Sequence, residues 1–506
     1  MHSLISCEEP VTMATLNLDS MRLAQRQWAS VPVARRVKIV RSLRHLIAAD
    51  ATTVAETVPL SLPGSLHRTV ADTLVSEVLP LLETCRFLER EAESILRTRH
   101  VGDDGRPVLL GRVTAEVQRA PWGIVLILAP ANYPLLLAGV QTLQALVAGN
   151  AVLWKPAPDT ETCAFALKTL FAESGLDAEL LTILPSDIAS AEAAFASGVD
   201  HVILTGSAQT GRAVLHQLAE TLTPSTMELS GCDAAFILPG ADLDHAVRAL
   251  AFGLRFNGSA TCMAPRRIFL VDLSQPEAAR FESSLAAALA EIGPVALPPA
   301  IEKQLRAMLD DAGEQTAEIM LDGLAEANSK ASSNPEVGCR ATLITRATPA
   351  LRSMQEEIFA PILSVMRAAS SEEALAAYAA CPYALTASVF GSEREARRFA
   401  HQIRAGNIVI NDLIVPTADP RIPFGGRGQS GFGVTRGTEG LFAMTTPCAI
   451  QSQKKVMPKV YESTSSRHVP LFAGLALVIH GSGFKQKWKG FFTVVRNALQ
   501  VTTRPK

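Results

Sequence analysis

The sequence lacks the patterns that mark several large classes of protein. Its 47 lysines and arginines nearly balance its 49 aspartates and glutamates, so it has none of the basic excess of a nucleic-acid binder. Its eight cysteines form no CxxC pair, which argues against a zinc site and against a disulfide framework. The N-terminus, MHSLISCEEP, has no basic stretch followed by an apolar run, as a secretory signal would. We therefore expect a cytoplasmic protein with neither a metal ion nor a nucleic-acid partner.

What the chain does contain is a large share of apolar residues. It is 48% hydrophobic and 19% charged, a composition that supports large buried cores rather than a disordered chain. Its 506 residues are enough for roughly two to four domains.

Short apolar runs alternate with helix-like segments along the chain. The first series predicts strands at residues 123–130, 150–156, 181–185 and 201–206. It also predicts two helices, at residues 135–149 and 160–175. A second series predicts strands at residues 266–271, 361–366, 387–391 and 406–411. Strands that are continuous apolar runs and alternate with helices indicate an α/β fold with buried parallel sheets.

Three stretches near predicted strand ends carry residues with a possible chemical role. TGSAQTG, residues 205–211, follows a strand and opens a helix, where free N–H groups favour a phosphate, although the GxGxxG spacing of the ordinary dinucleotide fold is missing. WKPAPDT puts Lys155 past the end of a strand, where α/β sheets bind ligands. MELSG contains Glu228, a candidate general base. Taken singly, each stretch also fits an ordinary turn or a solvated charge.

One cysteine lies among small residues. In NGSATCMAP, residues 257–265, Cys262 has an Asn-Gly turn behind it and a proline ahead. A free cysteine is most often a small buried hydrophobe, so core packing is the simplest interpretation. The other interpretation is a nucleophile. Attack by cysteine needs the thiolate, so it requires either a lowered pKa or a nearby base.

The order of the motifs decides between these interpretations. The chain resembles the aldehyde dehydrogenase superfamily over most of its length, from near residue 20 to near residue 455. The motifs that carry the resemblance are APANYP (129–134), WKPAP (154–158), LTGSAQTG (204–211), MELSG (227–231), NGSATCMAP (257–265), EEIFAP (356–361), GNIVIND (406–412) and PFGGRGQSGFG (423–433). The separation of Glu228 and Cys262, 34 residues, is also similar to that of the family.

The resemblance implies a mechanism and a small-molecule aldehyde as substrate. Cys262 would be the nucleophile that adds to the aldehyde carbonyl, and Asn132 would hold the oxyanion together with the backbone N–H of Cys262. Hydride transfer would leave a thioester, and Glu228 would activate the water that hydrolyses it.

The cofactor that the resemblance implies is NAD or NADP. Lys155 is similar to the ribose-binding lysine of the family, and Gly206 and Ser207 to the residues that contact the pyrophosphate. Glu357 and Phe359 are similar to the pair that holds the nicotinamide ribose and ring.

Three positions depart from the family's usual pattern. Ala131 stands before Asn132 where a tryptophan is usual, which opens space beside the oxyanion, and Ala360 replaces a glycine. Pro158 stands where NAD-preferring members often carry a glutamate that bonds the ribose 2′-hydroxyl and repels a 2′-phosphate. The missing carboxylate favours acceptance of NADP as well as NAD.

The resemblance also implies the fold and assembly. We expect two doubly wound parallel-sheet domains and a small β segment for oligomerisation, in a homo-oligomer that is a dimer or a tetramer. The expected boundaries are a cofactor-binding domain at 1–102 and 122–228, an oligomerisation segment at 103–121 and 441–456, a catalytic domain at 229–440, and an extension of unknown role at 457–506.

The extension lies outside the resemblance. Its apolar run at 469–479 is far shorter than the roughly 20 residues of a membrane-spanning helix. Basic and aromatic residues follow, among them Lys485, Trp488 and Phe492. Such a mixture fits an anionic membrane surface, which would make the protein peripheral to a membrane and long-chain aldehydes natural substrates. The simpler interpretation, which the sequence favours, is a segment that packs on the body of the protein or on a neighbouring subunit.

Two rival functions stay open at this stage. The thioester could pass to coenzyme A rather than to water, although Glu228 favours hydrolysis. Alternatively, the chain could bind a dinucleotide without catalysis, which the joint presence of Cys262, Glu228, Asn132 and Lys155 argues against.

Overall fold

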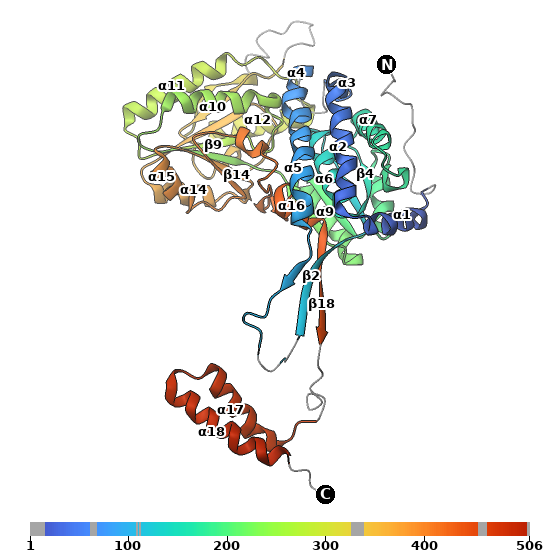
Figure 1. Cartoon of the computed structure of the whole chain (residues 1–506). Coiled ribbons are helices and arrows are strands. Elements are labelled where there is room, and N and C mark those ends of the chain that lie inside the picture. Colours follow the sequence, from blue (N-terminus) through green and yellow to red (C-terminus); the bar gives the residue numbers. More distant parts are fainter. Residues whose placement is uncertain are drawn as a thin grey trace. The chain divides into compact units, whose positions relative to one another are not determined.

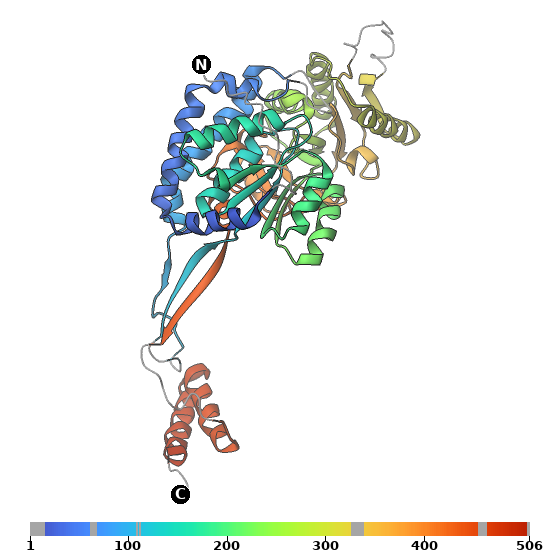
Figure 2. The same ribbon diagram turned by 90° about the vertical axis from the view of Figure 1, so that its right-hand side faces the viewer.

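The computed structural model describes residues 16–60, 68–107, 110, 113–324, 338–453 and 463–502. The chain divides into two compact units, one formed within residues 1–98 and 118–448 and the other within residues 99–117 and 449–506. The first unit contains two large sheets and their helices, and the second contains a helical hairpin (Figures 1 and 2).

The first large sheet has the strand order β17-β7-β6-β3-β4-β5. Five of its strands are parallel: β3 (Ile124–Leu128), β4 (Ala151–Lys155), β5 (Leu181–Ile183), β6 (His201–Gly206) and β7 (Ser225–Leu229). The edge strand β17 (Gly431–Phe432) runs antiparallel to β7. All five residues of β3 are buried, as expected for a central strand covered on both faces.

Helices surround this sheet (Figure 2). They are α1 (Leu18–Ser30), α2 (Val33–Ala49), α3 (Ala51–Glu56), α4 (Val70–Thr73), α5 (Leu79–Ile95), α6 (Leu136–Ala148), α7 (Glu161–Glu173), α8 (Ile188–Ala196), α9 (Ala208–Thr221) and α16 (Gly437–Ala443). Every residue of α6 is buried, and the helix ends at Gly149, whose φ of 103° closes it in the left-handed conformation that glycine adopts readily.

The second large sheet has the order β10-β11-β12-β9-β8-β14-β15. Its strands are β8 (Asp233–Ile237), β9 (Pro265–Val271), β10 (Glu318–Leu321), β11 (Thr342–Thr345), β12 (Ile362–Ala368), β14 (Thr386–Phe390) and β15 (Asn407–Ile410), all parallel except the edge strand β10. Its helices are α10 (Leu243–Arg255), α11 (Gln275–Ala290), α12 (Pro299–Glu314), α14 (Ser371–Ala379) and α15 (Glu393–Ala400). Phe236 and Phe269 stack on adjacent central strands with ring centroids 5.1 Å apart.

The predicted α/β class and every strand of the two predicted series are confirmed to within about two residues. The local sequence pattern did not predict β7, β8 or β11. The predicted parallel sheets are present, and each also carries one antiparallel edge strand. The edge strands are hard to recognise because β17 has only two residues and β10 is largely exposed.

A third sheet has the order β1-β2-β18. It consists of β1 (Arg99–Val101), β2 (Val113–Pro121) and β18 (Thr445–Gln453), and β1 is antiparallel to β2. β2 and β18 fall within the two segments predicted to mediate oligomerisation, whereas β1 lies just before the first of them.

The predicted extension contains a helical hairpin. After a short turn, Ser466–His468, α17 (Val469–His480) and α18 (Gly483–Thr502) lie side by side (Figures 1 and 2). Among the described residues, no helix is both long enough and apolar enough to cross a bilayer.

Candidate active site

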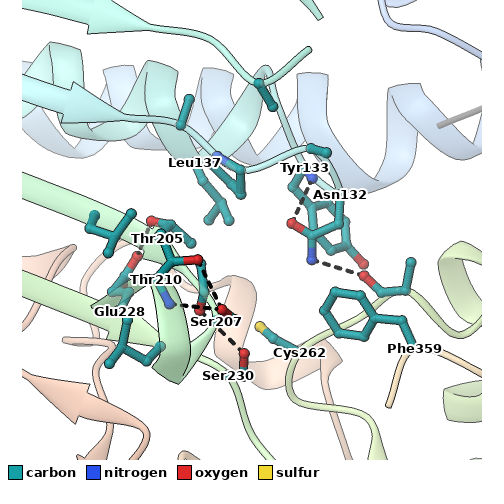
Figure 3. Close-up of a pocket in the computed structure, with 18 of the residues that line it drawn as sticks. Asn132, Tyr133, Leu137, Thr205, Ser207, Thr210, Glu228, Ser230, Cys262 and Phe359 are labelled. Atoms are coloured by element: carbon teal, nitrogen blue, oxygen red, sulfur yellow. Dashed lines mark hydrogen bonds between the residues drawn. The ribbon is translucent and has the colours of Figure 1, made fainter. Parts of the chain in front are cut away.

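One cavity of about 1230 Å³ brings the predicted site residues together (Figure 3). Its wall includes all eight residues singled out in the sequence: Asn132, Lys155, Gly206, Ser207, Glu228, Cys262, Glu357 and Phe359. Two of the three departures from the family pattern, Ala131 and Pro158, also line it.

Residues of the first sheet reach the cavity from the carboxyl ends of its parallel strands. Asn132 lies in the loop between β3 and α6, Lys155 ends β4, and Gly206 ends β6. Ser207 caps α9, with its Oγ accepting a 3.1 Å hydrogen bond from the N–H of Thr210. Parallel α/β sheets bind ligands at this edge because the helix N-termini and the loops converge there.

A tight turn presents Cys262. Asn257, Gly258 and Ser259 have successive positive φ values of 47°, 46° and 73°, so the chain reverses sharply before the cysteine. Buried Arg266 braces this turn through a 2.6 Å bond to the Ser259 Oγ and a 3.0 Å bond to the Ala360 carbonyl. The turn therefore holds the cysteine backbone in one position.

Steric crowding explains why the last residue of the MELSG motif, Gly231, is a glycine. A Cβ atom at Gly231 would lie 2.9 Å from the carbonyl oxygen of Cys262 and 2.9 Å from the Asp233 Oδ1. Real Cβ atoms essentially never come this close to such neighbours. A side chain at this position would therefore displace the cysteine loop.

The Asn132 amide is oriented toward the cysteine loop. Its Nδ2 donates a 2.8 Å hydrogen bond to the Ala260 carbonyl, and its Oδ1 accepts a 3.1 Å bond from the N–H of Tyr133. The Tyr133 hydroxyl lies 2.6 Å from the Thr261 Oγ1, a second link to the same loop. Since an amide nitrogen carries two hydrogens, Asn132 keeps a second donor for a substrate oxygen.

A buried ion pair fastens the loops of Asn132 and Cys262 to each other. Arg68 pairs with Glu77, and their side chains are 1% and 0% exposed. Arg68 also donates to the Asn132 carbonyl at 2.7 Å and to the Asn257 Oδ1 at 2.5 Å. Glu77 accepts the N–H groups of Leu135 and Leu136, both at 2.9 Å, at the start of α6.

Replacing Arg68 with alanine is expected to lower the free energy of unfolding by about 3–5 kcal/mol, because it leaves the Glu77 charge buried and unpaired. Arg41→Ala is the matched control: Arg41 also pairs with a glutamate, Glu89, but its side chain is 59% exposed. That change should cost less than about 1 kcal/mol. Denaturant unfolding measures the free energy of unfolding of both variants. Equal losses would show that the buried pair stabilises the fold no more than the exposed one.

Three neutral donors hold the Glu228 carboxyl group. The Gln141 Nε2 and the Thr205 Oγ1 each donate to its Oε2 at 3.2 Å, and the Thr435 hydroxyl donates to its Oε1 (Figure 3 shows the Thr205 contact). Burial nevertheless raises the pKa of Glu228, because desolvation of the carboxylate outweighs these bonds and the charge of Arg436.

The surroundings of Cys262 favour the thiol over the thiolate. Burial and the nearby carboxyl groups of Asp233, Glu228 and Glu357 raise its pKa to about 12. Of the two routes to a thiolate that the sequence left open, the raised pKa favours activation by a nearby base over a lowered thiol pKa. A base or an added positive charge must supply the activation.

Other residues of the cavity wall suit a dinucleotide. Lys155 is half-buried, and burial lowers its pKa. The N-terminus of α9 directs its N–H groups toward the site, as anion sites at helix ends do. The Glu357 Oε1 is buried with no hydrogen-bond partner among the described residues, and burial raises the pKa of this carboxyl to about 7. An unpaired buried carboxyl oxygen fits a ribose hydroxyl as donor.

Four residues of the site were missed in the sequence: Gln141, Thr205, Thr435 and Arg436. Gln141 gave a signal, since it is an amide within the apolar helix α6. Thr435 and Arg436 gave none, because they approach Glu228 only in the folded chain.

Comparison with known proteins agrees with this geometry. The model of the aldehyde dehydrogenase family matches residues 12–450. The chain is 29% identical over 452 residues to the 4,4'-diapolycopene aldehyde oxidase of Methylomonas sp, covering 87% of this chain and 82% of that relative. It is 30% identical over 433 residues to the succinate-semialdehyde dehydrogenase [NADP(+)] of Deinococcus radiodurans, covering 83% and 86%.

The fold has solved counterparts. An aldehyde dehydrogenase of Mycobacterium tuberculosis, crystallised with NAD+, superposes with a TM-score of 0.75 at 24% identity, covering 88% of this chain and 91% of that one. An aldehyde dehydrogenase of Brucella melitensis superposes with a TM-score of 0.78 at 23% identity, covering 88% and 91%. A cysteine, an amide donor and a carboxyl group in one cavity are the groups expected of an enzyme that works through a covalent cysteine intermediate. The chain belongs to the aldehyde dehydrogenase family.

Proposed function

We propose that the protein oxidises an aldehyde to a carboxylic acid with NAD or NADP as acceptor. One observation carries the proposal: a thiol, an amide donor and a carboxyl group share a single cavity with residues suited to a dinucleotide. The family membership and the NADP(+) named for the Deinococcus relative support the same activity.

In the proposed reaction, the Cys262 sulfur bonds to the aldehyde carbon after its proton leaves to a base. The oxyanion accepts hydrogen bonds from the Asn132 amide and the Cys262 N–H, each such donor contributing about 2.7–4 kcal/mol. NAD(P)+ bound in the cavity supplies the hydride acceptor. Loss of hydride from the carbon restores the carbonyl and leaves a thioester on the sulfur. Water then adds while Glu228 takes its proton, the carbon–sulfur bond breaks, and the acid and the thiol are released.

Glu228 supports hydrolysis over transfer to coenzyme A. Its carboxyl group is buried, but it lines the cavity in which Cys262 lies, so a water between them would be within reach of a base. Adding coenzyme A to turnover mixtures and assaying for an acyl thioester separates the two outcomes. We expect free acid with and without coenzyme A.

Pro158 is proposed to permit both cofactors. Pro158→Glu is expected to lower kcat/KM for NADP at least about tenfold and to leave that for NAD nearly unchanged, because the new carboxylate would repel only the 2′-phosphate. Steady-state kinetics with both cofactors measures the ratio, and Pro158→Gln, equal in size but uncharged, is the control. Equal loss with NAD and NADP would contradict the proposal.

We propose an apolar aldehyde as substrate. The cavity wall as a whole is largely apolar and includes Phe252, Phe256, Met263 and Val415. The Methylomonas relative, named as a 4,4'-diapolycopene aldehyde oxidase, supports this class. Arg436 favours a second class, an aldehyde that bears a carboxylate, since its Nε is buried without a partner among the described residues. The name of the Deinococcus relative supports that alternative.

The test is formation of reduced nicotinamide across short, long-chain, aromatic and acid-bearing aldehydes, with NAD and with NADP. We expect the highest kcat/KM for long-chain or aromatic substrates. Preference for the acid-bearing aldehydes, abolished by Arg436→Leu, would favour the second class. Cofactor binding with no turnover of any aldehyde would overturn the proposed function.

The assembly and localisation predictions remain proposals. We propose that 103–121 and 441–456 mediate a homo-oligomer. Support comes from β18, an edge strand of nine residues whose last seven are exposed, since an exposed edge can pair with another chain. Light scattering after size-exclusion chromatography gives the subunit number. The membrane-surface contact predicted for residues 457–506 involves none of the active-site residues. It can therefore be tested by a binding assay that does not measure aldehyde oxidation.

A further inference from the structure

Helix α17 is apolar on all sides yet largely exposed. It contains no lysine, arginine, aspartate or glutamate, and its sole buried residue is Gly474. Val469 is 63% exposed, Phe472 48% and Ile479 38%. A helix that is hydrophobic all round is normally covered by protein or by lipid. In this structure α17 therefore lacks most of the cover that such a helix normally has.

The two helices of the hairpin meet through glycines. A Cβ atom at Gly490 would lie 2.7 Å from the Val478 backbone nitrogen and 2.8 Å from the Gly474 carbonyl oxygen. Such close backbone contact uses little side-chain area, so the larger apolar side chains project outward from the pair. Small residues at helix crossings are a packing mode frequent in membranes, where lipid covers the outer faces.

Helix α18 carries an aromatic ridge, defined here as Phe484, Trp488, Phe491 and Phe492. The spacing i, i+4, i+7, i+8 places all four on one face. Their exposed fractions are 76%, 51%, 49% and 55%. Trp488 contacts the other three rings at centroid distances of 5.3 to 5.9 Å. The ridge is thus an ordered apolar surface with an indole, a side chain enriched at membrane interfaces.

Positive charge flanks the ridge. Lys485, Lys489 and Arg496 fall on one side of it at helical spacing, and Lys487 falls on the other. Residues 454–506 contain ten lysines and arginines and one acid, whereas residues 1–453 contain 37 basic and 48 acidic residues. Like charge disfavours contact between the hairpins of two copies. Anionic lipid instead satisfies both the charge and the apolar ridge.

We propose that the α17–α18 hairpin is an interfacial membrane anchor for an anionic bilayer. The ridge and α17 enter the boundary between headgroups and acyl chains, and the lysines reach the lipid phosphates. At 12 residues, α17 is about 18 Å long, well short of the roughly 30 Å hydrocarbon core, and among the described residues no helix is long and apolar enough to cross a bilayer, so the hairpin would lie in the surface. If the proposed function also holds, the anchor brings the enzyme to apolar aldehydes dissolved in the membrane.

The test is flotation of the full chain with vesicles of phosphatidylcholine alone or mixed with phosphatidylglycerol. The ridge variant combines Phe484→Ser, Trp488→Ser and Phe491→Ser, and the charge variant combines Lys485→Gln, Lys487→Gln and Lys489→Gln. The control combines Leu23→Ser and Leu222→Ser, at residues 58% and 87% exposed and remote from the hairpin in sequence.

We expect the wild type and the control to bind anionic vesicles at least tenfold more tightly than neutral ones. The ridge variant should lose at least tenfold on anionic vesicles, and the charge variant should lose the preference for anionic lipid. Trp488→Phe keeps the ridge apolar but removes its indole. Subtracting the fluorescence spectrum of this variant from that of the wild type isolates the emission of Trp488, which should shift to the blue on vesicle binding. All variants should oxidise a short soluble aldehyde like the wild type, which separates this proposal from the proposed function.

Flotation of the ridge variant equal to that of the wild type would overturn the proposal, as would absence of vesicle binding by the wild type. If the ridge variant instead changes the oligomeric mass without any vesicle binding, a second copy of the chain covers the hairpin and the membrane assignment is wrong.

Discussion

Replacing Cys262 with alanine is expected to lower kcat/KM for any aldehyde by at least about 10⁴-fold, because Cys262 is the one cysteine among the described residues that line the cavity. Cofactor affinity should stay close to that of the wild type, since the groups suited to the dinucleotide are side chains other than Cys262. Formation of reduced nicotinamide measures turnover, and quenching of protein fluorescence by the cofactor measures binding.

Cys448→Ala is the matched control for this change. Cys448 is exposed and is not among the residues that line the cavity. Its replacement should leave kcat/KM unchanged. Turnover by Cys262→Ala within tenfold of the wild type would contradict a covalent mechanism at this residue.

Replacing Glu228 with glutamine is expected to slow steady-state turnover by about 10²–10⁴-fold, the usual contribution of a general base. The amide cannot take a proton from water, so hydrolysis of the thioester should become the slow step. The first turnover should persist as a burst of reduced nicotinamide, with one equivalent formed per active site. Stopped-flow absorbance resolves the burst, and a variant that loses the burst as well would place Glu228 in an earlier step.

The pH dependence follows from the raised pKa of Glu228. Burial makes this carboxyl group hold its proton to higher pH than an exposed glutamate does. The base is active only when ionised, so kcat should rise with pH as Glu228 loses its proton. Glu228→Gln should lack this rising limb, whereas Glu228→Asp should retain one.

Much of the fold could be predicted because a buried parallel strand is recognisable from its own short run of apolar residues. GIVLIL and HVIL are continuous apolar runs, and glycines close the helices that follow or precede them. β7 and β8 were missed because STMEL and DAAFI mix polar and small residues, although nearly all of these residues are buried. Their burial is a property of the sheet and not of the local pattern.

The positions of the site residues could be predicted because the family motifs occur in order, yet the chemistry of the groups could not. Thr435 is 207 residues from Glu228 in sequence and still donates a hydrogen bond to it. Likewise, the Cys262 pKa is raised by burial and by carboxyl groups from three other segments. Such shifts depend on distances that exist only in the folded chain.

The central claim is that the substrate becomes bonded to Cys262, and trapping the acyl-enzyme tests it most directly. Glu228→Gln protein mixed with aldehyde and cofactor would be quenched in acid, digested and analysed by mass spectrometry. The account predicts the mass of one acyl group on the peptide that contains Cys262, and none in the Cys262→Ala, Glu228→Gln double variant. Reduced nicotinamide without such an adduct, or an acyl group on another residue, would contradict it.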